Sequence, residues 1–307
     1  MTAVVTIVVP TFRRPDSLER LLRSVLNDIE ARDDVAIVVA DNDVKQSAEE
    51  TVKRLSDDFG RDIDYTVAPD PGVSNARNAG MARVNSRYVL FLDDDMEVRP
   101  NFVGPMLAAS QSLNAAITFA PIEAVLPDGM EHMTDWIGPM FSRRIGGETR
   151  LIDEAMGTGG CLLDMDGLSL PSPIFDPALN EVGGEDDALF AAIFAQGGKS
   201  AWCSEVTALE HVPPHRSTLG YLWARQFAFG QTPSREAADR GLSGLLSVLK
   251  WMIVGAAQVG LHGLAFVSLK IANRPSAIGQ FGRLAQGVGK IFWWDGLSPK
   301  FYGANAR

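Results

Sequence analysis

Three consecutive carboxylates, Asp93, Asp94 and Asp95, directly follow the apolar and aromatic run at residues 88–92. Such a continuous run predicts a strand buried on both faces, and charged side chains cannot follow it into the core unpaired. We therefore expect the triplet just beyond the carboxyl end of the strand, at the edge where open α/β sheets bind ligands. Because hard divalent cations take oxygen ligands of this kind, the triplet predicts a cation site. The alternative is an acidic turn exposed to solvent.

The elements that would position this triplet alternate between strand-like and helical patterns. The predicted strands cover residues 4–9, 36–40, 64–67, 88–92 and 116–120, and Pro10 is expected to end the first. Apolar residues at helical spacing predict helices between them, as at Leu18, Leu21, Leu22, Val25 and Leu26. This alternation predicts an α/β fold with a doubly wound, mostly parallel sheet. We expect the stretch 121–151, where periodicity fades, to be a long loop or a small subdomain.

Two further stretches carry residues suited to a site. The glycine-rich run at residues 157–160 allows either close backbone approach to a ligand or a tight strand edge. Glu185-Asp186-Asp187 opens a predicted helix, and because the helix dipole favours acids in a first turn, that preference alone could account for them. Cys161 and Cys203 make neither a disulfide framework nor a metal motif, so we expect two buried, inert thiols.

Composition and charge suggest a protein built in two parts. The 307 residues are 46% hydrophobic and 21% charged, as in a globular protein with a substantial core. The net charge of −10 argues against nucleic acid as a partner. Residues 241–307 carry seven Lys or Arg and one Asp, a net charge of +6, which leaves −16 for residues 1–240. We therefore predict an acidic body over residues 1–240 and a basic, apolar helical tail over residues 241–307.

Several motifs occur together in an order that resembles the family 2 glycosyltransferases of GT-A fold. They are Pro10-Thr11-Phe12-Arg13-Arg14, Asp41, Gly72-Val73-Ser74-Asn75-Ala76-Arg77-Asn78, Phe91-Leu92-Asp93-Asp94-Asp95 and Gly184-Glu185-Asp186. The resemblance covers roughly residues 1–230. The segment Glu210-His211-Val212-Pro213-Pro214-His215-Arg216 is similar to one found in bacterial exopolysaccharide transferases of the succinoglycan type. The resemblance implies a catalytic domain with the GT-A sheet over residues 1–240.

The resemblance also implies which residues hold the donor. Thr11 and Phe12 would line the pocket for the nucleotide base, and Asp41 would accept hydrogen bonds from the base or ribose. Arg77 would contact the base or the phosphates, unless it forms a surface salt bridge. The remaining donor-binding residues are Asp94 and Arg216, the latter as a clamp on the diphosphate.

The metal and catalytic residues follow from the same resemblance. Asp93 and Asp95 match the family's Asp-x-Asp motif and would hold Mg²⁺ or Mn²⁺ against the donor diphosphate. His211, preferred over His215, would complete the metal site. Asp186 matches the catalytic base, which takes the proton of the acceptor hydroxyl in a displacement that inverts the anomeric carbon. Glu185 and Asp187 would orient the acceptor.

The tail poses a separate question. Residues 251–269, between Lys250 and Lys270, are almost uncharged and about long enough to span a bilayer. Gln258 and His262 interrupt the stretch, so we expect a basic, apolar segment that lies in the interface of an anionic membrane. In this interpretation Trp293 and Trp294 would anchor at the headgroups. The alternatives are a spanning helix and a helical hairpin packed on the catalytic domain.

The sequence as a whole predicts an inverting, metal-dependent transferase. Its donor would be a nucleotide-diphosphate sugar, with UDP as the first choice and dTDP and GDP left open. The sugar itself is not predicted, because Gly159-Gly160-Cys161 departs from the family pattern. Its acceptor would be a glycan or lipid-linked saccharide in exopolysaccharide or cell-surface polysaccharide synthesis. With no export signal at the start, we expect a cytoplasmic protein, peripheral at the inner face of the bacterial plasma membrane. The alternatives are a haloacid dehalogenase-type phosphatase and a sugar-nucleotide-binding scaffold without turnover.

Overall fold

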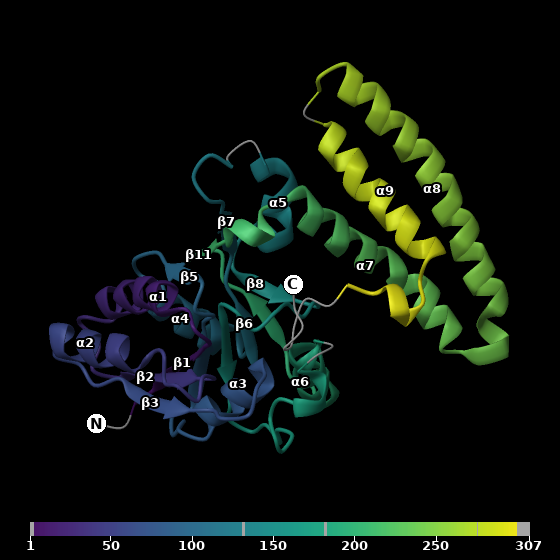
Figure 1. Cartoon of the computed structure of the whole chain (residues 1–307). Coiled ribbons are helices and arrows are strands. Elements are labelled where there is room, and N and C mark those ends of the chain that lie inside the picture. Colours follow the sequence, from purple (N-terminus) through teal and green to yellow (C-terminus); the bar gives the residue numbers. More distant parts are fainter. Residues whose placement is uncertain (1–2, 131–132, 181–182, 275, 300–307) are drawn as a thin grey trace. The chain divides into compact units, whose positions relative to one another are not determined.

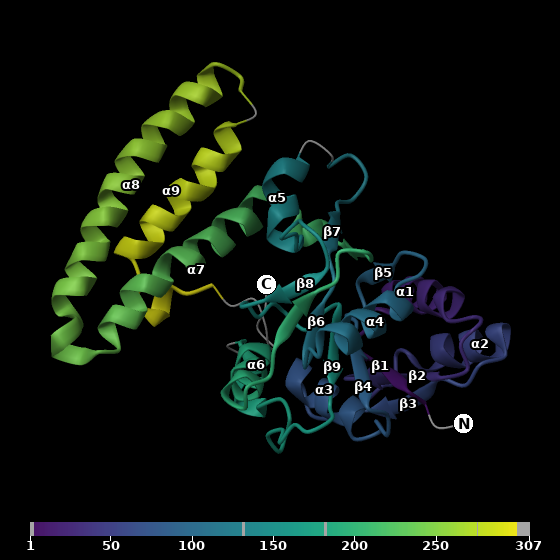
Figure 2. The ribbon, with the colours of Figure 1, turned by 180° about the vertical axis from the view of Figure 1, so that it is seen from behind.

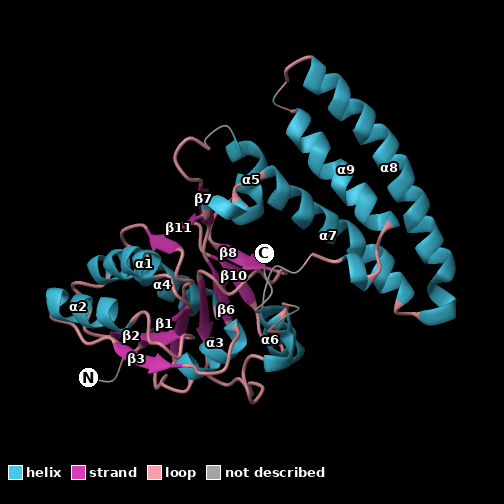
Figure 3. Ribbon diagram, in the orientation of Figure 1, coloured by secondary structure: helices cyan, strands magenta, loops and turns pink. Residues whose placement is uncertain are grey.

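A computed structural model describes residues 3–130, 133–180, 183–274 and 276–299. Within them the chain forms two compact units, one of residues 3–125 and 141–211 and one of residues 126–140 and 212–299. The second unit therefore begins earlier in the chain than the boundary expected after residue 240, and it contains a further segment before residue 141. Figure 3 shows that the strands belong to the first unit and that the second is helical.

The first unit contains two sheets and five α-helices in the described residues. Its strands are β1 (Val5–Thr11), β2 (Val35–Asp41), β3 (Asp64–Val67), β4 (Tyr88–Phe91), β5 (Met96–Val98), β6 (Ile117–Phe119), β7 (Ile122–Val125), β8 (Arg150–Ile152), β9 (Cys161–Asp164), β10 (Ser200–Trp202) and β11 (Ala208–His211). Its helices are α1 (Pro15–Asp28), α2 (Glu49–Phe59), α3 (Val73–Met81), α4 (Val103–Leu113) and α6 (Glu185–Ala195), with a 3₁₀ turn at Pro177–Leu179.

The main sheet has the strand order β3-β2-β1-β4-β9-β6-β10-β8 (Figure 1). Its first four strands are parallel, as are β6 and β10, while β9 and β8 run antiparallel to their neighbours. The predicted doubly wound, mostly parallel sheet is confirmed. The antiparallel strand β9 was not predicted, because hydrophobic periodicity carries no information on strand direction.

Helices cover both faces of the sheet, and each face has its own hydrophobic core. One core packs the odd-numbered residues of β1 against α1, α2 and α4, and it contains the complete apolar stripe of α1 that the spacing predicts. The other packs Val8, Val89 and Phe91 against α6 and the end of α3. Gly80 lets α3 approach the sheet, since a Cβ there would lie 2.6 Å from Cγ1 of Val8. The buried strands thus fix where their carboxyl ends deliver the polar residues.

The expected end of the first strand was wrong, and so was one of the two alternatives for residues 121–151, the long loop. Pro10 does not end the first strand, which runs on to Thr11 paired with β2. The carbonyl of Thr11 accepts a hydrogen bond from the amide of Asn42, so the backbone groups of Thr11 point toward β2 and those of Pro10 point toward β4. The pairing of β1 with β4 ends at Val8, and no amide donor is therefore needed at Pro10. The stretch 121–151 is not a bare loop, because it holds β7, a helix and the start of β8. Strand β7 joins β11 and β5 in a second, three-stranded sheet.

The second unit consists of helices. They are most of α5 (Thr134–Phe141), the 3₁₀ turns at Pro214–Arg216, Gly241–Gly244 and Asp295–Leu297, and the long helices α7 (Leu219–Ala238), α8 (Leu245–Ile271) and α9 (Ala277–Ile291). Both views show α8 and α9 side by side along most of α9 (Figures 1 and 2). The predicted tail is therefore helical, and it packs together with α7.

Candidate active site

The carboxyl ends of three neighbouring strands bring the predicted polar residues to one edge of the sheet. Thr11 and Asp41 are paired residues at the ends of β1 and β2, and the acidic triplet follows β4, which pairs with the other side of β1. In a doubly wound sheet this edge is the usual ligand site. The expectation that these residues would meet is confirmed.

Asp94 lies at the centre of the triplet's contacts. Its Oδ2 accepts a hydrogen bond from the Thr11 hydroxyl at 2.8 Å, and its Oδ1 accepts one from Nη1 of Arg14 at 3.2 Å. The same Arg14 nitrogen lies 3.2 Å from Oδ2 of Asp95. Asp94 is 6% exposed, and this burial raises its pKa although Arg14 and Thr11 oppose the shift. An acidic turn in solvent is therefore excluded.

Arg77 joins the triplet to the acidic start of α6. Its Nη2 donates to Oδ1 of Asp93 at 3.2 Å, and its Nη1 donates to Oε1 of Glu185 at 2.6 Å. The guanidinium is 5% exposed and lies over the ring of Phe175. Burial opposes its charge, but the carboxylates of Asp93 and Glu185 outweigh that cost and raise the pKa of Arg77. The alternative of a surface salt bridge was therefore wrong.

The glycine-rich loop at residues 157–160 touches both Asp93 and Asp186. A Cβ on Gly159 would lie 2.6 Å from Oδ2 of Asp93, and one on Gly157 would lie 3.5 Å from Oδ2 of Asp186. Both carboxylates thus lie close to this loop, and a side chain at position 159 would collide with Asp93. Close approach of a ligand to this loop stays a prediction, and the loop leads into β9, an interior strand of the sheet.

The three acids that open α6 differ in their surroundings. Glu185 is 8% exposed and bonded to Arg77, whereas Asp186 is half-buried and Asp187 is exposed. Oδ1 of Asp186 accepts the backbone amide of Asp187 at 2.9 Å, which orients its carboxylate. Partial desolvation and the charge of Asp186 raise the pKa of Asp187. The helix dipole favours all three acids, but it does not account for the buried ion pair of Glu185.

Arg143 is a site residue that the sequence analysis missed. Its guanidinium donates to the carbonyls of Ala120, Gly157 and Gly159, and a fourth contact reaches the carbonyl of Gly160. Burial lowers the pKa of Arg143 to about 10. Arg143 therefore acts as a clamp on the glycine-rich loop. A lone arginine in an aperiodic stretch offers no sequence signal for this role.

Asp41 and Phe12 lie at the far side of the same edge. Asp41 is fully buried and accepts from the amides of Asp43 and Ala48 and from the hydroxyl of Tyr65. Its carboxylate therefore shapes the loop that follows β2, and its contact with a nucleotide stays a prediction. The ring of Phe12 is 49% exposed, as a surface for stacking requires.

Comparison with known proteins identifies the chain. The model of the family described as "Glycosyl transferase family 2" matches residues 6–163, which include the triplet and the glycine-rich loop. The chain belongs to glycosyl transferase family 2. The phosphatase alternative is thereby excluded. This glycosyltransferase is 30% identical over 247 residues to the succinoglycan biosynthesis protein ExoM of Rhizobium meliloti (strain 1021), covering 78% of this chain and 77% of that protein.

Solved structures confirm the fold of the glycosyltransferase. S. aureus TarS residues 1–349 in complex with UDP gives a TM-score of 0.53 at 13% identity, covering 100% of this chain and 98% of that one. GalNAc-T7 with UDP, GalNAc and Mn²⁺ gives a TM-score of 0.51 at 15% identity, covering 76% and 51% of the two chains. The predicted GT-A fold is confirmed.

His211 and Arg216 were expected to complete the glycosyltransferase site. The amide of His211 donates to the carbonyl of Asp95 at 2.8 Å, because β11 pairs with β5 immediately after the triplet. Nε2 of its ring lies 2.8 Å from Oε2 of Glu97. Arg216 belongs to the second unit. The roles of both side chains stay predictions.

The oxygen ligands that the triplet offers fit a divalent cation. Asp93 and Asp95 offer carboxylate oxygens, the ligands that Mg²⁺ and Mn²⁺ prefer, and Asp93 keeps 35% of its side chain exposed. Within residues 3–130, 133–180, 183–274 and 276–299, no group of three or more His, Cys, Asp or Glu is arranged to hold a metal. Arg14 and Arg77 balance the charge of these acids instead. A metal here would therefore take further ligands from the donor.

Proposed function

We propose that this glycosyltransferase is an inverting, metal-dependent enzyme that uses a nucleotide-diphosphate sugar, with UDP as the first choice. The observation that carries the proposal is that two carboxylates, Asp93 and Asp186, both lie close to the glycine-rich loop at residues 157–160. One carboxylate belongs to the acidic triplet and suits the donor diphosphate with its cation. The other accepts a backbone amide at one oxygen, lies near the charges of Arg77 and Arg143, and suits a base. UDP is present in the TarS and GalNAc-T7 structures, which supports the choice of nucleotide.

The donor would bind along the strand ends. Phe12 is half exposed, with the guanidinium of Arg13 over its ring, and would stack on the base, while the hydroxyl of Thr11 holds Asp94 in place. The remaining donor contacts proposed are Asp41, Arg77 and Arg216. Arg14 and Arg77 offset part of the negative charge of the triplet and Glu185, and a bound cation would offset more of it before the diphosphate approaches. A bound cation on Asp93 and Asp95 would stabilise the charge of the leaving diphosphate.

Asp186 would act on the acceptor. Its Oδ1 is oriented by the amide of Asp187, and its Oδ2 faces the glycine-rich loop. In the proposed step the acceptor hydroxyl oxygen bonds to the anomeric carbon, its proton passes to Asp186, and the bond from that carbon to the diphosphate oxygen breaks with the electron pair on the leaving group. Attack from the face opposite the leaving group inverts the configuration.

The residues proposed to contact the acceptor are chosen by the exposure of their side chains. Asp187 is exposed and suits an acceptor contact, whereas Glu185 is committed to Arg77 and holds that guanidinium in position. The likeness to the succinoglycan biosynthesis protein supports a glycan or lipid-linked saccharide acceptor in exopolysaccharide or cell-surface polysaccharide synthesis. We propose that the enzyme works in the cytoplasm, as a peripheral protein at the inner face of the plasma membrane.

The first test is thermal stabilisation by UDP, dTDP and GDP, each with Mn²⁺ and with EDTA. A ligand that binds the native state raises the melting temperature in proportion to saturation. We expect UDP with Mn²⁺ to stabilise the wild type and Asp95→Ala to lose that effect. Asp166→Asn is the matched control, because Asp166 is an exposed acid paired with Arg87 outside the triplet. No shift with any nucleotide would refute the donor site.

Asp186→Asn separates an enzyme from a binding scaffold. We expect this variant to keep its UDP-dependent melting shift and to lose the release of UDP from UDP-sugars, because the amide cannot accept the proton. A wild type that binds UDP but releases none from any sugar nucleotide, with or without acceptor extracts, would favour the scaffold.

A further inference from the structure

The outward side of α8 is an exposed apolar stripe. Its residues recur at spacings of three and four, as one helix face requires: Leu246, Leu249, Ile253, Ala257, Gly260, Leu264, Val267 and Ile271. Leu246, Leu264 and Ile271 are 81%, 74% and 82% exposed. This stripe, called the α8 outer face below, extends over a helix of 27 residues, about 40 Å long. Soluble proteins rarely expose a continuous apolar surface of this length.

Two polar side chains near the middle of α8, Gln258 and His262, face the neighbouring helix instead. Gln258 donates to the carbonyl of Arg283 and accepts from Nζ of Lys290, both on α9. Nδ1 of His262 lies 2.6 Å from Oε1 of Gln280. The residues that interrupt the apolar stretch in the sequence are thus satisfied inside the unit. Polar contacts inside and aliphatic side chains outside are the reverse of a helix on a soluble core.

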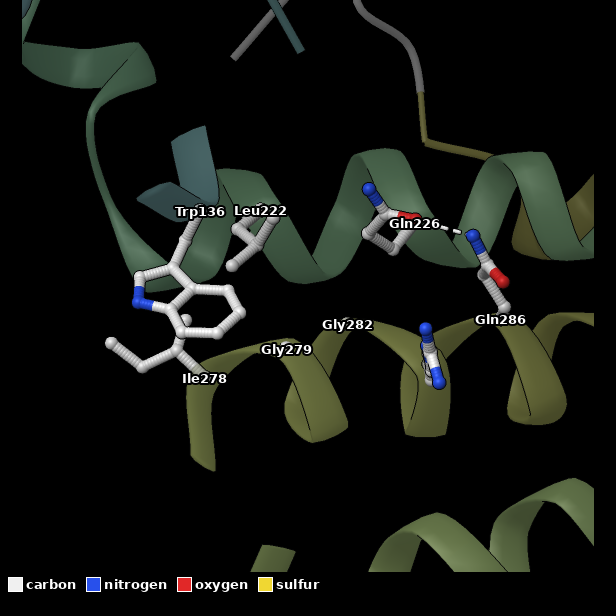
Figure 4. A pocket seen from close by; sticks show the side chains of 8 residues that line it. Trp136, Leu222, Gln226, Ile278, Gly279, Gly282 and Gln286 are labelled. Atoms are coloured by element: carbon white, nitrogen blue, oxygen red, sulfur yellow. Dashed lines mark hydrogen bonds between the residues drawn. The ribbon is translucent and has the colours of Figure 1, made fainter. Parts of the chain in front are cut away.

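Glycines bring the three long helices close together. A Cβ on Gly255 of α8 would lie 2.7 Å from the carbonyl of Gly287 on α9, and one on Gly230 of α7 would lie 2.2 Å from the carbonyl of Gln286. Figure 4 shows a pocket of about 210 Å³ between α7 and α9, beside which Gln286 donates to Gln226. Packing by small residues and interhelical hydrogen bonds does not depend on burying large apolar side chains. The large side chains of α8 therefore remain available on the outside.

We propose that α8 lies in the plane of an anionic membrane with its outer face buried in the hydrocarbon. This deepens the proposed function, since it names the surface by which the enzyme would reach a lipid-linked acceptor. Charge supports the choice of partner, because residues 241–307 carry a net charge of +6. Lys250 and Lys270, near the two ends of α8, can reach the headgroups with their long side chains.

A second copy of the chain is a weaker partner for this face. Helix α8 contains no Asp or Glu, so two such helices would bring Lys250 or Lys270 together without any opposite charge. Paired helices normally use complementary charges beside the apolar seam. Anionic lipid supplies the missing negative charge.

The polar neighbours of α8 favour an in-plane helix over a crossing one. Gln258 lies at the middle of α8, and its partner Arg283 has an exposed side chain. A crossing orientation would carry Arg283 to the centre of the bilayer, which is costly for a charged side chain. In the plane, α9 and Arg283 stay on the aqueous side.

The test measures binding of the full-length protein to vesicles that contain phosphatidylglycerol or phosphatidylcholine alone. We expect binding to the anionic vesicles that weakens but persists at high salt, since apolar burial is not screened. Ile253→Glu with Leu264→Glu should weaken it at least tenfold, because each removes a buried aliphatic side chain from hydrocarbon. Leu151→Glu, an exposed leucine of the first unit, is the control and should bind as the wild type does.

Depth is measured with dyes on introduced cysteines, because both native thiols are buried. A dye at Leu264→Cys should be quenched by spin-labelled acyl chains, and one at Arg283→Cys should not. Equal quenching at both positions would overturn the in-plane arrangement. Vesicle binding that is unaffected by the two glutamates would overturn the proposal that the α8 outer face binds the membrane. A dimer that forms without lipid and that the two glutamates dissociate would also overturn it. The UDP melting shift, measured on every variant, tells a failed surface from a failed donor site.

Discussion

Replacing Arg77 by methionine tests the network that joins the triplet to α6. Arg77 and Glu185 are 5% and 8% exposed, and the variant leaves the Glu185 carboxylate buried without its cation. Removing one partner of a buried ion pair typically costs about 3–5 kcal/mol. Asp93 retains 35% of its side-chain exposure and is solvated in part. We therefore expect the lower end, about 3 kcal/mol in the free energy of unfolding.

Urea unfolding followed by circular dichroism measures this cost, provided that the slope of the transition is unchanged. Arg83→Met is the control, since Arg83 also donates two bonds to carboxylate oxygens, both of Asp64, but with both side chains exposed. Exposed pairs contribute about 0–1 kcal/mol. The difference between the two variants isolates the effect of burial.

A double variant identifies the cause of the loss. Arg77→Met with Glu185→Gln removes the unpaired charge, and we expect it to recover at least half of the stability lost by Arg77→Met alone. The reasoning is refuted if Arg77→Met costs no more than Arg83→Met. It is also refuted if the losses of the two single variants simply add.

Three further predictions concern the glycine-rich loop and the thiols. Gly159→Ala should weaken UDP binding about tenfold, measured by titration with Mn²⁺, because its Cβ displaces the carboxylate of Asp93. Arg143→Met should lower the free energy of unfolding by about 2–3 kcal/mol, measured in urea, because several loop carbonyls lose a charged donor. Burial raises the pKa of Cys161 and Cys203, so the native thiols stay protonated while the unfolded ones ionise. The stability they contribute is therefore present below the ordinary thiol pKa and is lost as pH rises, for Cys161 by about 1 kcal/mol at pH 9.5 in urea melts.

Each of these predictions has its own control. Gly138→Ala in α5 meets its nearest side chain at 3.7 Å and should leave UDP binding unchanged, so equal losses at both glycines would point to a general effect. Arg143→Met fails as a test of the clamp if stability holds while UDP binding is lost. Cys161→Ala should flatten the alkaline loss, and an unchanged pH profile would assign it to other groups.

The pattern of the sequence was sufficient for the parallel half of the sheet and for the edge of the site. Continuous apolar runs that end in Thr11, Asp41 and the acidic triplet can be buried in one way, with their polar ends at the carboxyl edge. The apolar stripe of α1 was likewise predictable, because its spacing matches one helix face. Those features depend on the pattern of apolar and polar residues within single segments of the chain.

Contacts between distant residues were decided by the tertiary structure. The pair of Arg77 with Glu185 spans 108 positions, and that of His211 with Glu97 spans 114. Arg143 reaches the glycine-rich loop from a stretch without periodicity. Several arginines and acids in the chain could satisfy one another, and the choice depends on which strands become neighbours in the sheet.

The tail illustrates the same division. Its composition alone predicted a basic, apolar helix, since charge and hydropathy are properties of the residues themselves. The direction in which its side chains point depends on what packs against the helix. Glycine contacts and the bonds of Gln258 and His262 turn the polar side of α8 toward α9 and leave the aliphatic side outward. That orientation is decided by packing, because the same helix in a soluble core would bury its aliphatic side and expose its polar side.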